Sequence, residues 1–245
     1  MTTLEKVRVL VVGDSGVGKS CLVHLICHNQ VCSNPSYTIG AAVDVKIHEY
    51  KEGTPKQKSY FIELWDVGGS VNHSNSRHVF YNQVNGIILV HELTNRKSQL
   101  NLRKWLAEVL SRDNGGGRSK STSEYDPEQF AGCQVPILVL GTKADQVDSK
   151  REAYLSNTSL IAEECGADEF NLDCLNVKHL APGSTNSVKL SRFFDKVVFR
   201  RFYQYPARDS PQKVIDRRQV SRESSQFGSH QDRRRLNSQK SFHMD

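Results

Sequence analysis

Residues 13–20 combine glycines, a lysine and a serine at a spacing suited to holding phosphates. They read Gly-Asp-Ser-Gly-Val-Gly-Lys-Ser, which fits the pattern Gly, four residues, Gly-Lys-Ser/Thr. Glycines let the backbone curl until several N–H groups point at one anion, and a following helix adds the positive end of its dipole. Lys19 can reach the outer phosphates. The predicted phosphate-binding residues are Asp14, Ser15, Gly16, Val17, Gly18, Lys19, Ser20 and Cys21.

A carboxylate and two hydroxyls complete a predicted magnesium site. Asp66 follows a predicted strand in Trp-Asp-Val-Gly-Gly, where it can hold the ion through water. The Ser20 hydroxyl can ligate the same ion. Thr38 lies in the loop after the helix predicted at residues 21–28, and its hydroxyl can bind the ion when a third phosphate is present. The N–H of Gly69 can face that phosphate, so Thr38 and Gly69 are predicted to sense it.

A third stretch, Gly141-Thr142-Lys143-Ala144-Asp145, predicts the base of the nucleotide. The Asp145 carboxylate can accept two hydrogen bonds from N1–H and the exocyclic amine of guanine. Adenine has no such donor pair, so this carboxylate favours guanine. The stem of Lys143 can lie flat on the base. Taken alone, an aspartate such as Asp145 is more often a helix N-cap than a residue that binds a base; its place in the ordered set of motifs favours the base.

Alternating strands and helices are predicted to position these residues. Short apolar runs at residues 7–12, 86–91 and 135–141 predict buried strands, and residues 43–47 and 59–65 predict a hairpin. Helices are predicted over about 97–112, with Leu100 and Trp105 facing inward, about 150–165, ending at Gly166, and about 186–203. The pattern predicts an α/β P-loop NTPase fold: a six-stranded, mostly parallel sheet flanked by helices, with ligands at the carboxyl ends of the strands.

The predicted domain occupies residues 1–205 and carries a surface insertion at about 113–132. Residues 206–245 contain nine Lys or Arg and five Asp or Glu, which supplies four of the six net positive charges of the chain. Few large apolar residues occur in this basic tail, so it is predicted to be disordered. Binding of nucleic acid or anionic lipid by the tail is an alternative. The interspersed acids and scarce aromatics favour a solvated linker, and no nucleic-acid partner is expected.

Composition favours a cytoplasmic protein. No stretch approaches the roughly eighteen continuous apolar residues that span a bilayer. The six cysteines have no paired, metal-like spacing, which favours reduced thiols. No cysteine follows Cys174, so no prenyl or palmitoyl anchor is expected.

With these motifs in order, the chain resembles small GTPases of the Ras superfamily, Rab branch. Residues 13–20 and 80–95 carry the resemblance, which extends over about 5–205. It implies GTP or GDP with Mg²⁺, and a homodimer whose surface the sequence does not select. It also implies that Thr142, Lys143 and Asp145 contact guanine, together with a fifth motif faintly visible at Asp173 and Cys174.

Two departures from the family pattern shape the functional expectation. Ser70 stands where efficient GTPases have the glutamine that orients the attacking water, so we expect very slow intrinsic hydrolysis and name no catalytic residue. Thr142 replaces an asparagine that ties its loop to the phosphate loop, so we expect weaker nucleotide affinity. The favoured interpretation is a GTP-binding switch or scaffold. The alternative is a turning-over GTPase whose activating partner supplies an arginine and compensates for Ser70. The effector, exchange factor and pathway stay open.

Overall fold

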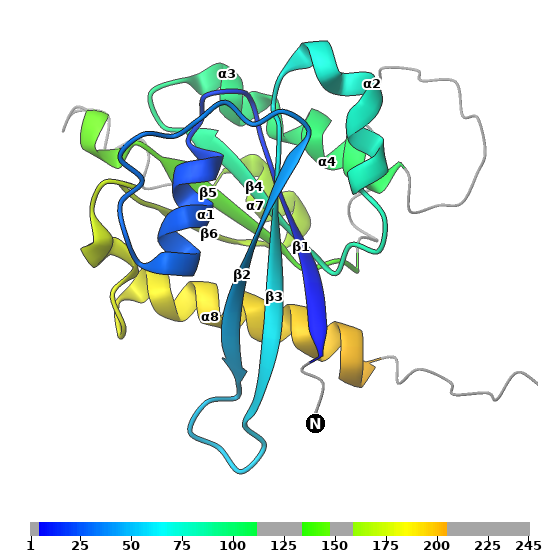
Figure 1. Cartoon of the computed structure of the whole chain (residues 1–245), viewed down its shortest axis with the longest axis vertical. Coiled ribbons are helices and arrows are strands. Elements are labelled where there is room, and N and C mark those ends of the chain that lie inside the picture. The colour runs from blue at the N-terminus through cyan, green and yellow to red at the C-terminus, as the bar shows by residue number, and fades with distance from the viewer. Residues whose placement is uncertain (1–4, 112–133, 148–158, 205–245) are drawn as a thin grey trace, which may run out of the picture. The chain divides into compact units, whose positions relative to one another are not determined.

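A six-stranded sheet with helices on both faces forms the body of the protein (Figure 1). The computed structural model describes residues 5–111, 134–147 and 159–204. The strand order is β2-β3-β1-β4-β5-β6, and every neighbouring pair is parallel except the antiparallel pair β2–β3. The strands are β1 Lys6–Val12, β2 Ala41–Tyr50, β3 Lys58–Val67, β4 Gly86–Glu92, β5 Ile137–Thr142 and β6 Asp168–Asn171.

The two central strands, β1 and β4, are mainly apolar. Apart from Lys6 and Arg8 in β1 and Glu92 in β4 their residues are buried, as in strands of a parallel sheet covered on both faces. Their register pairs Val9 with Gly86 and Val11 with Ile88. Because parallel strands end at the same edge, the loops after β1, β3, β4 and β5 lie together at one edge of the sheet.

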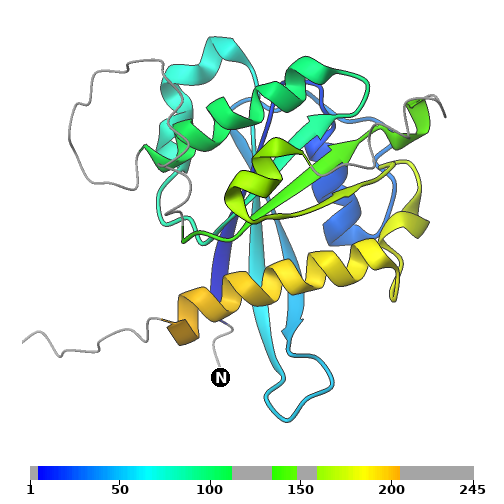
Figure 2. The same cartoon turned by 180° about the vertical axis from the view of Figure 1, so that it is seen from behind.

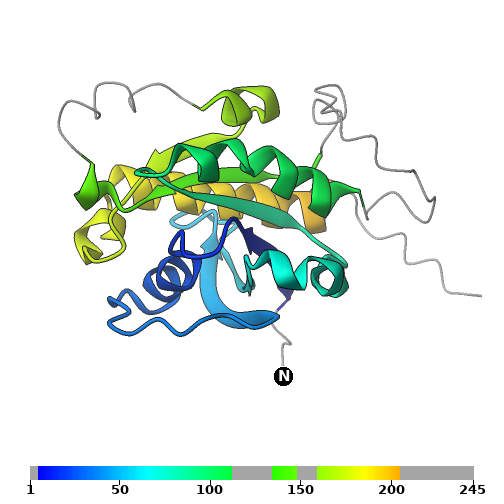
Figure 3. The ribbon, with the colours of Figure 1, turned by 90° about the horizontal axis from the view of Figure 1, so that it is seen from above.

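Helices pack against the sheet through two separate apolar clusters. One cluster joins α1 and α8 to one face, and the other joins α4 and α7 to the opposite face. Figure 2, which views the molecule from behind, shows α8 crossing the near face of the sheet. Figure 3 shows α1 and α2 on either side of the loop after β1. The α-helices are α1 Lys19–His28, α2 Ser74–Arg77, α3 Arg96–Leu100, α4 Leu102–Leu110, α7 Leu160–Cys165 and α8 Thr185–Phe199. Short 3₁₀ turns are η1 Val71–His73, η2 His78–Phe80, η3 Ala144–Gln146 and η4 Val177–Leu180.

The β2–β3 hairpin projects past α8 at the end of the sheet away from the loop after β1 (Figures 1 and 2). A π-helical turn, η5 Arg200–Gln204, follows α8 and anchors this projection. Tyr203 stacks on Tyr50 with ring centroids 5.2 Å apart, and its hydroxyl lies 2.9 Å from that of Tyr60. The last turn of the described chain therefore holds both strands of the hairpin.

The structure confirms the predicted fold class but differs from the prediction for one helix. The predicted helix over 97–112 is two helices, α3 and α4, separated at Asn101. Leu100 is 58% exposed, so the prediction that it faces inward is wrong. Helix α7 ends at Gly166 as predicted, because Gly166 adopts φ 58° as a left-handed cap.

Some sequence predictions fall on parts of the chain beyond the described ranges. These are the insertion at 113–132, most of the predicted helix before Leu160, and the tail 206–245. Within the described ranges, none of the helices combines the length and apolar character that a membrane span requires.

Candidate nucleotide-binding site

The glycine-rich loop, residues 13–20, leads from β1 into α1, and its glycines permit the close approaches and left-handed backbone angles that this turn requires. A Cβ atom at Gly13 would lie 2.1 Å from the carbonyl oxygen of Val90 in β4, so only glycine fits there. Gly16 and Gly18 adopt φ angles of 81° and 92°, which side chains disfavour. Helix α1 then begins at Lys19 and presents its N-terminus to the loop.

Lys19 folds back over this loop. Its Nζ donates to the carbonyl oxygens of Gly13 and Asp14, each at 2.9 Å, and the residue is 6% exposed. Burial lowers the pKa of Lys19 to about 8. The nearby carboxylates of Asp66 and Asp14 oppose that shift, and Arg77 adds to it. The phosphate loop thus holds a buried amine that a bound anion would keep charged.

Three side-chain oxygens converge beside Lys19. The Ser20 hydroxyl donates to Asp66 Oδ2 at 2.6 Å, and the Thr38 hydroxyl donates to the same atom at 3.0 Å. The two hydroxyl oxygens lie 3.0 Å from each other. The structure therefore brings together the three predicted metal ligands, although Ser20 and Asp66 are 46 residues apart in the sequence.

This oxygen cluster fits Mg²⁺. Asp66 is 2% exposed, and its second oxygen, Oδ1, is buried without a hydrogen-bond partner in the described part of the chain. A carboxylate with hydroxyls supplies the hard oxygen ligands that Mg²⁺ prefers. Among residues 5–111, 134–147 and 159–204, no group of three or more His, Cys, Asp or Glu side chains forms an alternative metal site.

Gly68 and Gly69 bring the end of β3 against both neighbouring loops. A Cβ at Gly68 would lie 2.6 Å from the carbonyl oxygen of Thr38, and its N–H donates to Gly40 O at 2.8 Å. A Cβ at Gly69 would lie 2.5 Å from Asp14 C and Ser15 N. The end of β3 is therefore in backbone contact with both the segment that holds Thr38 and the phosphate loop.

Thr142 ties the end of β5 to the phosphate loop. Its fully buried hydroxyl lies 2.5 Å from Val17 O and 3.1 Å from His91 O, and its one hydrogen can be donated to either carbonyl. A Cβ at Gly18 would be only 3.7 Å from the Thr142 side chain. The tether that the sequence analysis expected an asparagine to provide is thus made by the threonine hydroxyl.

Lys143 and Asp145 extend from this tether toward solvent. Lys143 adopts φ 58°, and its Nζ donates to Glu92 Oε2 at 2.7 Å, which fixes the end of its stem. Hydrogen bonds from Lys143 and Thr94 hold the pKa of the Glu92 carboxyl below its usual range despite partial burial. Asp145 lies in η3 with an exposed side chain.

The loop after β6 lies beside the loop after β5. Ala144 N–H donates to Leu172 O at 3.3 Å. Burial, aided by the nearby Cys21, Asp173 and Asp145, raises the pKa of the Cys174 thiol to about 12. The predicted base-binding residues of both loops thus gather next to α1, where Cys21 lies.

The Asp173 side chain serves its own turn. Its Oδ1 accepts the N–H of Leu175 at 2.7 Å, and its backbone N–H donates to His179 Nδ1 at 2.8 Å. These two bonds fix the backbone that precedes Cys174. The geometry therefore favours a contact to a base through backbone groups here, with the Asp173 carboxylate supporting the turn.

Comparison with known proteins identifies the family of this chain. A family model described as Ras of Complex, Roc, domain of DAPkinase, matches residues 8–119. Rab-like protein 3 of Homo sapiens is 57% identical over 209 residues, covering 83% of this chain and 89% of the relative. Rab-like protein 3 of Danio rerio is 52% identical over 251 residues, covering all of both. The chain belongs to the Rab-like protein 3 family.

Similarity extends to a more distant protein with a small-GTPase name. Small GTPase LIP1 of Arabidopsis thaliana is 41% identical over 225 residues, covering 81% of this chain and 63% of the relative. Small GTPases bind guanine nucleotides, which agrees with the motifs at residues 13–20 and 141–145.

Ser70, at the glutamine position of efficient GTPases, is occupied in a local cap. Its hydroxyl accepts the N–H of Asn72 at 3.3 Å at the start of η1. Its carbonyl oxygen accepts a hydrogen bond from Arg77 Nη1 at 2.9 Å. Both interactions hold Ser70 toward the α2 segment, and its side chain is too short to reach across the site.

Two residues that hold the phosphate loop were missed by the sequence analysis. Trp105 Nε1 donates to Asp14 Oδ1 at 2.8 Å, and Asn101 Nδ2 donates to Asp14 Oδ2 at 2.7 Å. Asn101 directly precedes α4 and Trp105 lies in its first turn, so their spacing of four residues, which brings side chains to the same side, was a usable signal. Trp105 faces inward as predicted and is 5% exposed, and its N–H has this second role.

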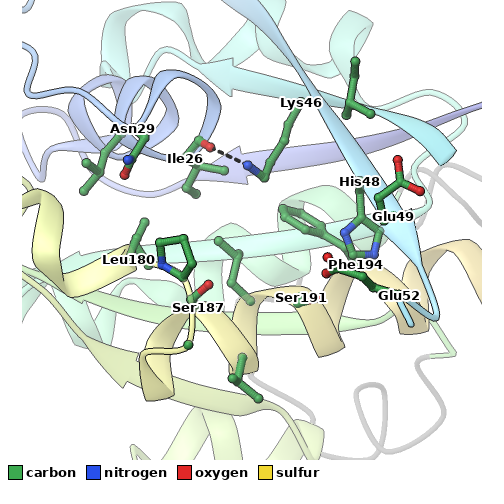
Figure 4. A pocket seen from close by; sticks show the side chains of 16 residues that line it. Ile26, Asn29, Lys46, His48, Glu49, Glu52, Leu180, Ser187, Ser191 and Phe194 are labelled. Carbon is green, nitrogen blue, oxygen red and sulfur yellow. Dashed lines mark hydrogen bonds between the residues drawn. The ribbon is translucent and has the colours of Figure 1, made fainter. Parts of the chain in front are cut away.

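A cavity of about 520 Å³ lies elsewhere, between α1, β2 and α8 (Figure 4). None of the predicted nucleotide-binding residues lines it. Lys46 Nζ donates to Ile26 O at 3.1 Å on one side, and His48 bonds Asp195 at 2.8 Å on the other. We assign the cavity no part in nucleotide binding.

Proposed function

We propose that this chain is a guanine-nucleotide-binding switch that holds GTP with Mg²⁺ and hydrolyses it very slowly. One observation carries the proposal. The oxygens of Ser20, Thr38 and Asp66 lie within 3.0 Å of one another next to the buried amine of Lys19. The other oxygen of the Asp66 carboxylate is buried and has no hydrogen-bond partner in the described part of the chain.

The phosphates would lie on the glycine-rich loop. Backbone N–H groups of residues 14–21 and the N-terminus of α1 would bind them, and Lys19 would leave its two carbonyl partners to contact the outer phosphates. Mg²⁺ would neutralise phosphate charge, held by Ser20, Thr38 and Asp66. Thr38 and Gly69 would respond to the third phosphate because their segments already meet at Gly68.

The base would lie against the loops after β5 and β6. Asp145 is exposed and able to accept the two guanine donors, and the stem of Lys143 is fixed by Glu92. Thr142 would support this loop through Val17, and the backbone at Asp173 and Cys174 would border the base. Guanine would be selected over adenine because adenine lacks the donor pair.

The test is to identify the nucleotide that co-purifies with the chain and to time its loss with and without Mg²⁺. We expect retained GTP whose loss accelerates when Mg²⁺ is chelated, and displacement by GDP but not by ADP. Retained GDP would restore the alternative of a turning-over GTPase. Equal displacement by ADP and GDP would refute guanine selection, and a chain that binds neither would refute the proposal.

We also propose that the chain forms a homodimer through the outer face of β2. Val43, Val45 and Ile47 alternate along this edge strand and are 45%, 49% and 60% exposed. Three apolar side chains on one face of a sheet edge form a surface suited to association. A partner protein would compete for this face, which begins at the segment that holds Thr38.

A further inference from the structure

Asp14 connects the phosphate lysine to helix α4. Its carbonyl oxygen accepts Lys19 Nζ at 2.9 Å. Its two carboxylate oxygens accept Trp105 Nε1 at 2.8 Å and Asn101 Nδ2 at 2.7 Å. Hydrogen bonds to a charged acceptor are the stronger kind, so the position of this loop depends on α4.

The other side of Trp105 carries an arginine from the segment after Gly69. The Arg77 guanidinium carbon lies 4.2 Å from the centroid of the Trp105 ring, and Arg77 is 5% exposed. Arg77 also donates to both oxygens of Glu108, at 3.1 and 2.9 Å. A buried guanidinium over an indole ring is a favourable cation–π pair.

Arg77 returns to the start of its own segment through Ser70. Its Nη1 donates to Ser70 O at 2.9 Å. Gly69, the preceding residue, packs against the Asp14–Ser15 peptide, where a Cβ would come within 2.5 Å. The contacts therefore close a ring that runs from Asp14 through Trp105, Arg77, Ser70 and Gly69 back to Asp14.

We infer that Trp105 is a positioning residue for the third phosphate. It holds the phosphate loop by its N–H and the Gly69–Ser70 segment by its ring, so the two move as one unit. This inference rests on the proposed binding of GTP. GDP would contact the phosphate loop alone, whereas GTP would also need Gly69 in place, so loss of the ring of contacts weakens GTP binding more than GDP binding.

Trp105→Phe tests the inference directly. Phenylalanine keeps an aromatic ring but lacks the N–H that Asp14 accepts. We expect the Kd for GTP to rise about tenfold, the effect of one lost hydrogen bond to a charged group, while the Kd for GDP changes by less than about threefold. Both are measured with Mg²⁺ by displacement of a fluorescent guanine nucleotide.

A matched pair of arginine variants guards against a fold defect in Trp105→Phe. Arg77→Lys removes the two-pronged contact with Glu108 and loosens the contact with Trp105, and we expect the same selective loss of GTP affinity. Arg103→Lys is the control. Arg103 lies on α4, the helix of Trp105, and donates to both oxygens of Glu164, away from the phosphate loop. Its GTP to GDP ratio is expected to match that of the wild type.

Tryptophan emission gives a readout that a purely structural role would not move. The chain has two tryptophans, so Trp65→Phe leaves Trp105 as the sole reporter. Its emission is expected to differ between the GDP and GTP complexes. Unchanged emission, or an Arg77→Lys variant with the wild-type GTP to GDP ratio, would overturn the inference. A wild-type chain that binds neither nucleotide would instead overturn the proposed function, so the two failures are distinct.

Discussion

Lys19 shows how burial sets the chemistry of one residue. Its amine is almost wholly removed from water, and its pKa falls from an ordinary 10.5 to about 8. In a nucleotide complex the phosphates would favour the charged form and restore a high pKa. The free chain and the complex would therefore hold different numbers of protons at this residue above pH 8.

The first prediction concerns pH. As pH rises through 8, Lys19 loses its proton in the free chain but keeps it in the complex. Nucleotide binding then requires uptake of a proton from solution, so the affinity falls as pH rises. We expect the Kd for GTP to rise roughly tenfold between pH 7 and pH 9. Calorimetric titration at several pH values measures this. Lys19→Arg is the control, because its charge does not titrate in this range, and equally steep profiles for both chains would contradict the prediction.

The second prediction concerns hydrolysis. Glutamine at position 70 reaches farther than serine and can orient the attacking water. We expect Ser70→Gln to raise the single-turnover rate of GTP hydrolysis by at least about tenfold. Ser76→Gln places the same side chain on exposed α2 and should leave the rate unchanged. A wild-type rate equal to that of an efficient small GTPase would remove the basis of this prediction.

Among the elements, β5 is joined to the phosphate loop through the hydroxyl of Thr142. Thr142 is fully buried, and two carbonyl oxygens face its one hydrogen. The loop that would read the base and the loop that would hold the phosphates are thus coupled through one side chain. Asparagine would offer two N–H donors in the same place.

The third prediction follows from that coupling. Thr142→Val keeps the shape of the side chain and removes the hydroxyl, which leaves Val17 O and His91 O short of a donor. We expect a stability loss of about 1–3 kcal/mol and nucleotide release about tenfold faster. Denaturant unfolding and stopped-flow release measure the two effects. Thr54→Val removes an exposed hydroxyl from the hairpin turn and should change neither.

Elements and site residues could be predicted from the sequence where the signal lies in a short stretch of neighbouring residues. Ser20, Thr38 and Asp66 were expected to meet because each follows or precedes an element that ends at one sheet edge. The break at Asn101 was not, since Leu100 continues the helical period and only the structure turns it outward. Sequence offered no sign of the Arg77–Glu108 pair, because its partners are 31 residues apart and meet only when α2 packs on α4.

For the whole molecule, the sheet separates two surfaces. The candidate nucleotide site lies at the carboxyl ends of the parallel strands, while the β2–β3 hairpin extends away from it past α8 (Figure 1). The stack of Tyr203 on Tyr50 ties the hairpin to the end of α8. A dimer formed through β2 would therefore bury a surface that begins near Thr38 and extends along the hairpin, away from the candidate nucleotide site.

The fourth prediction tests self-association. Ile47→Glu places a charge on the outer face of β2, and we expect the dimer dissociation constant to rise at least about tenfold by analytical ultracentrifugation. Val188→Glu is the matched control, since Val188 is 48% exposed but lies on α8. A wild-type chain that sediments as a monomer at all concentrations, or equal effects of the two variants, would rule out this interface.

Gly13 has a consequence for the lifetime of the protein. Because its backbone lies directly against Val90, the phosphate loop is built onto β1 and β4, the two strands at the centre of the sheet. A nucleotide bound there at a hundred times its Kd would add about 2.7 kcal/mol to the free energy of unfolding of the entire sheet. We therefore expect the abundance of this protein in a cell to follow the supply of guanine nucleotide, with the empty form removed first by proteolysis.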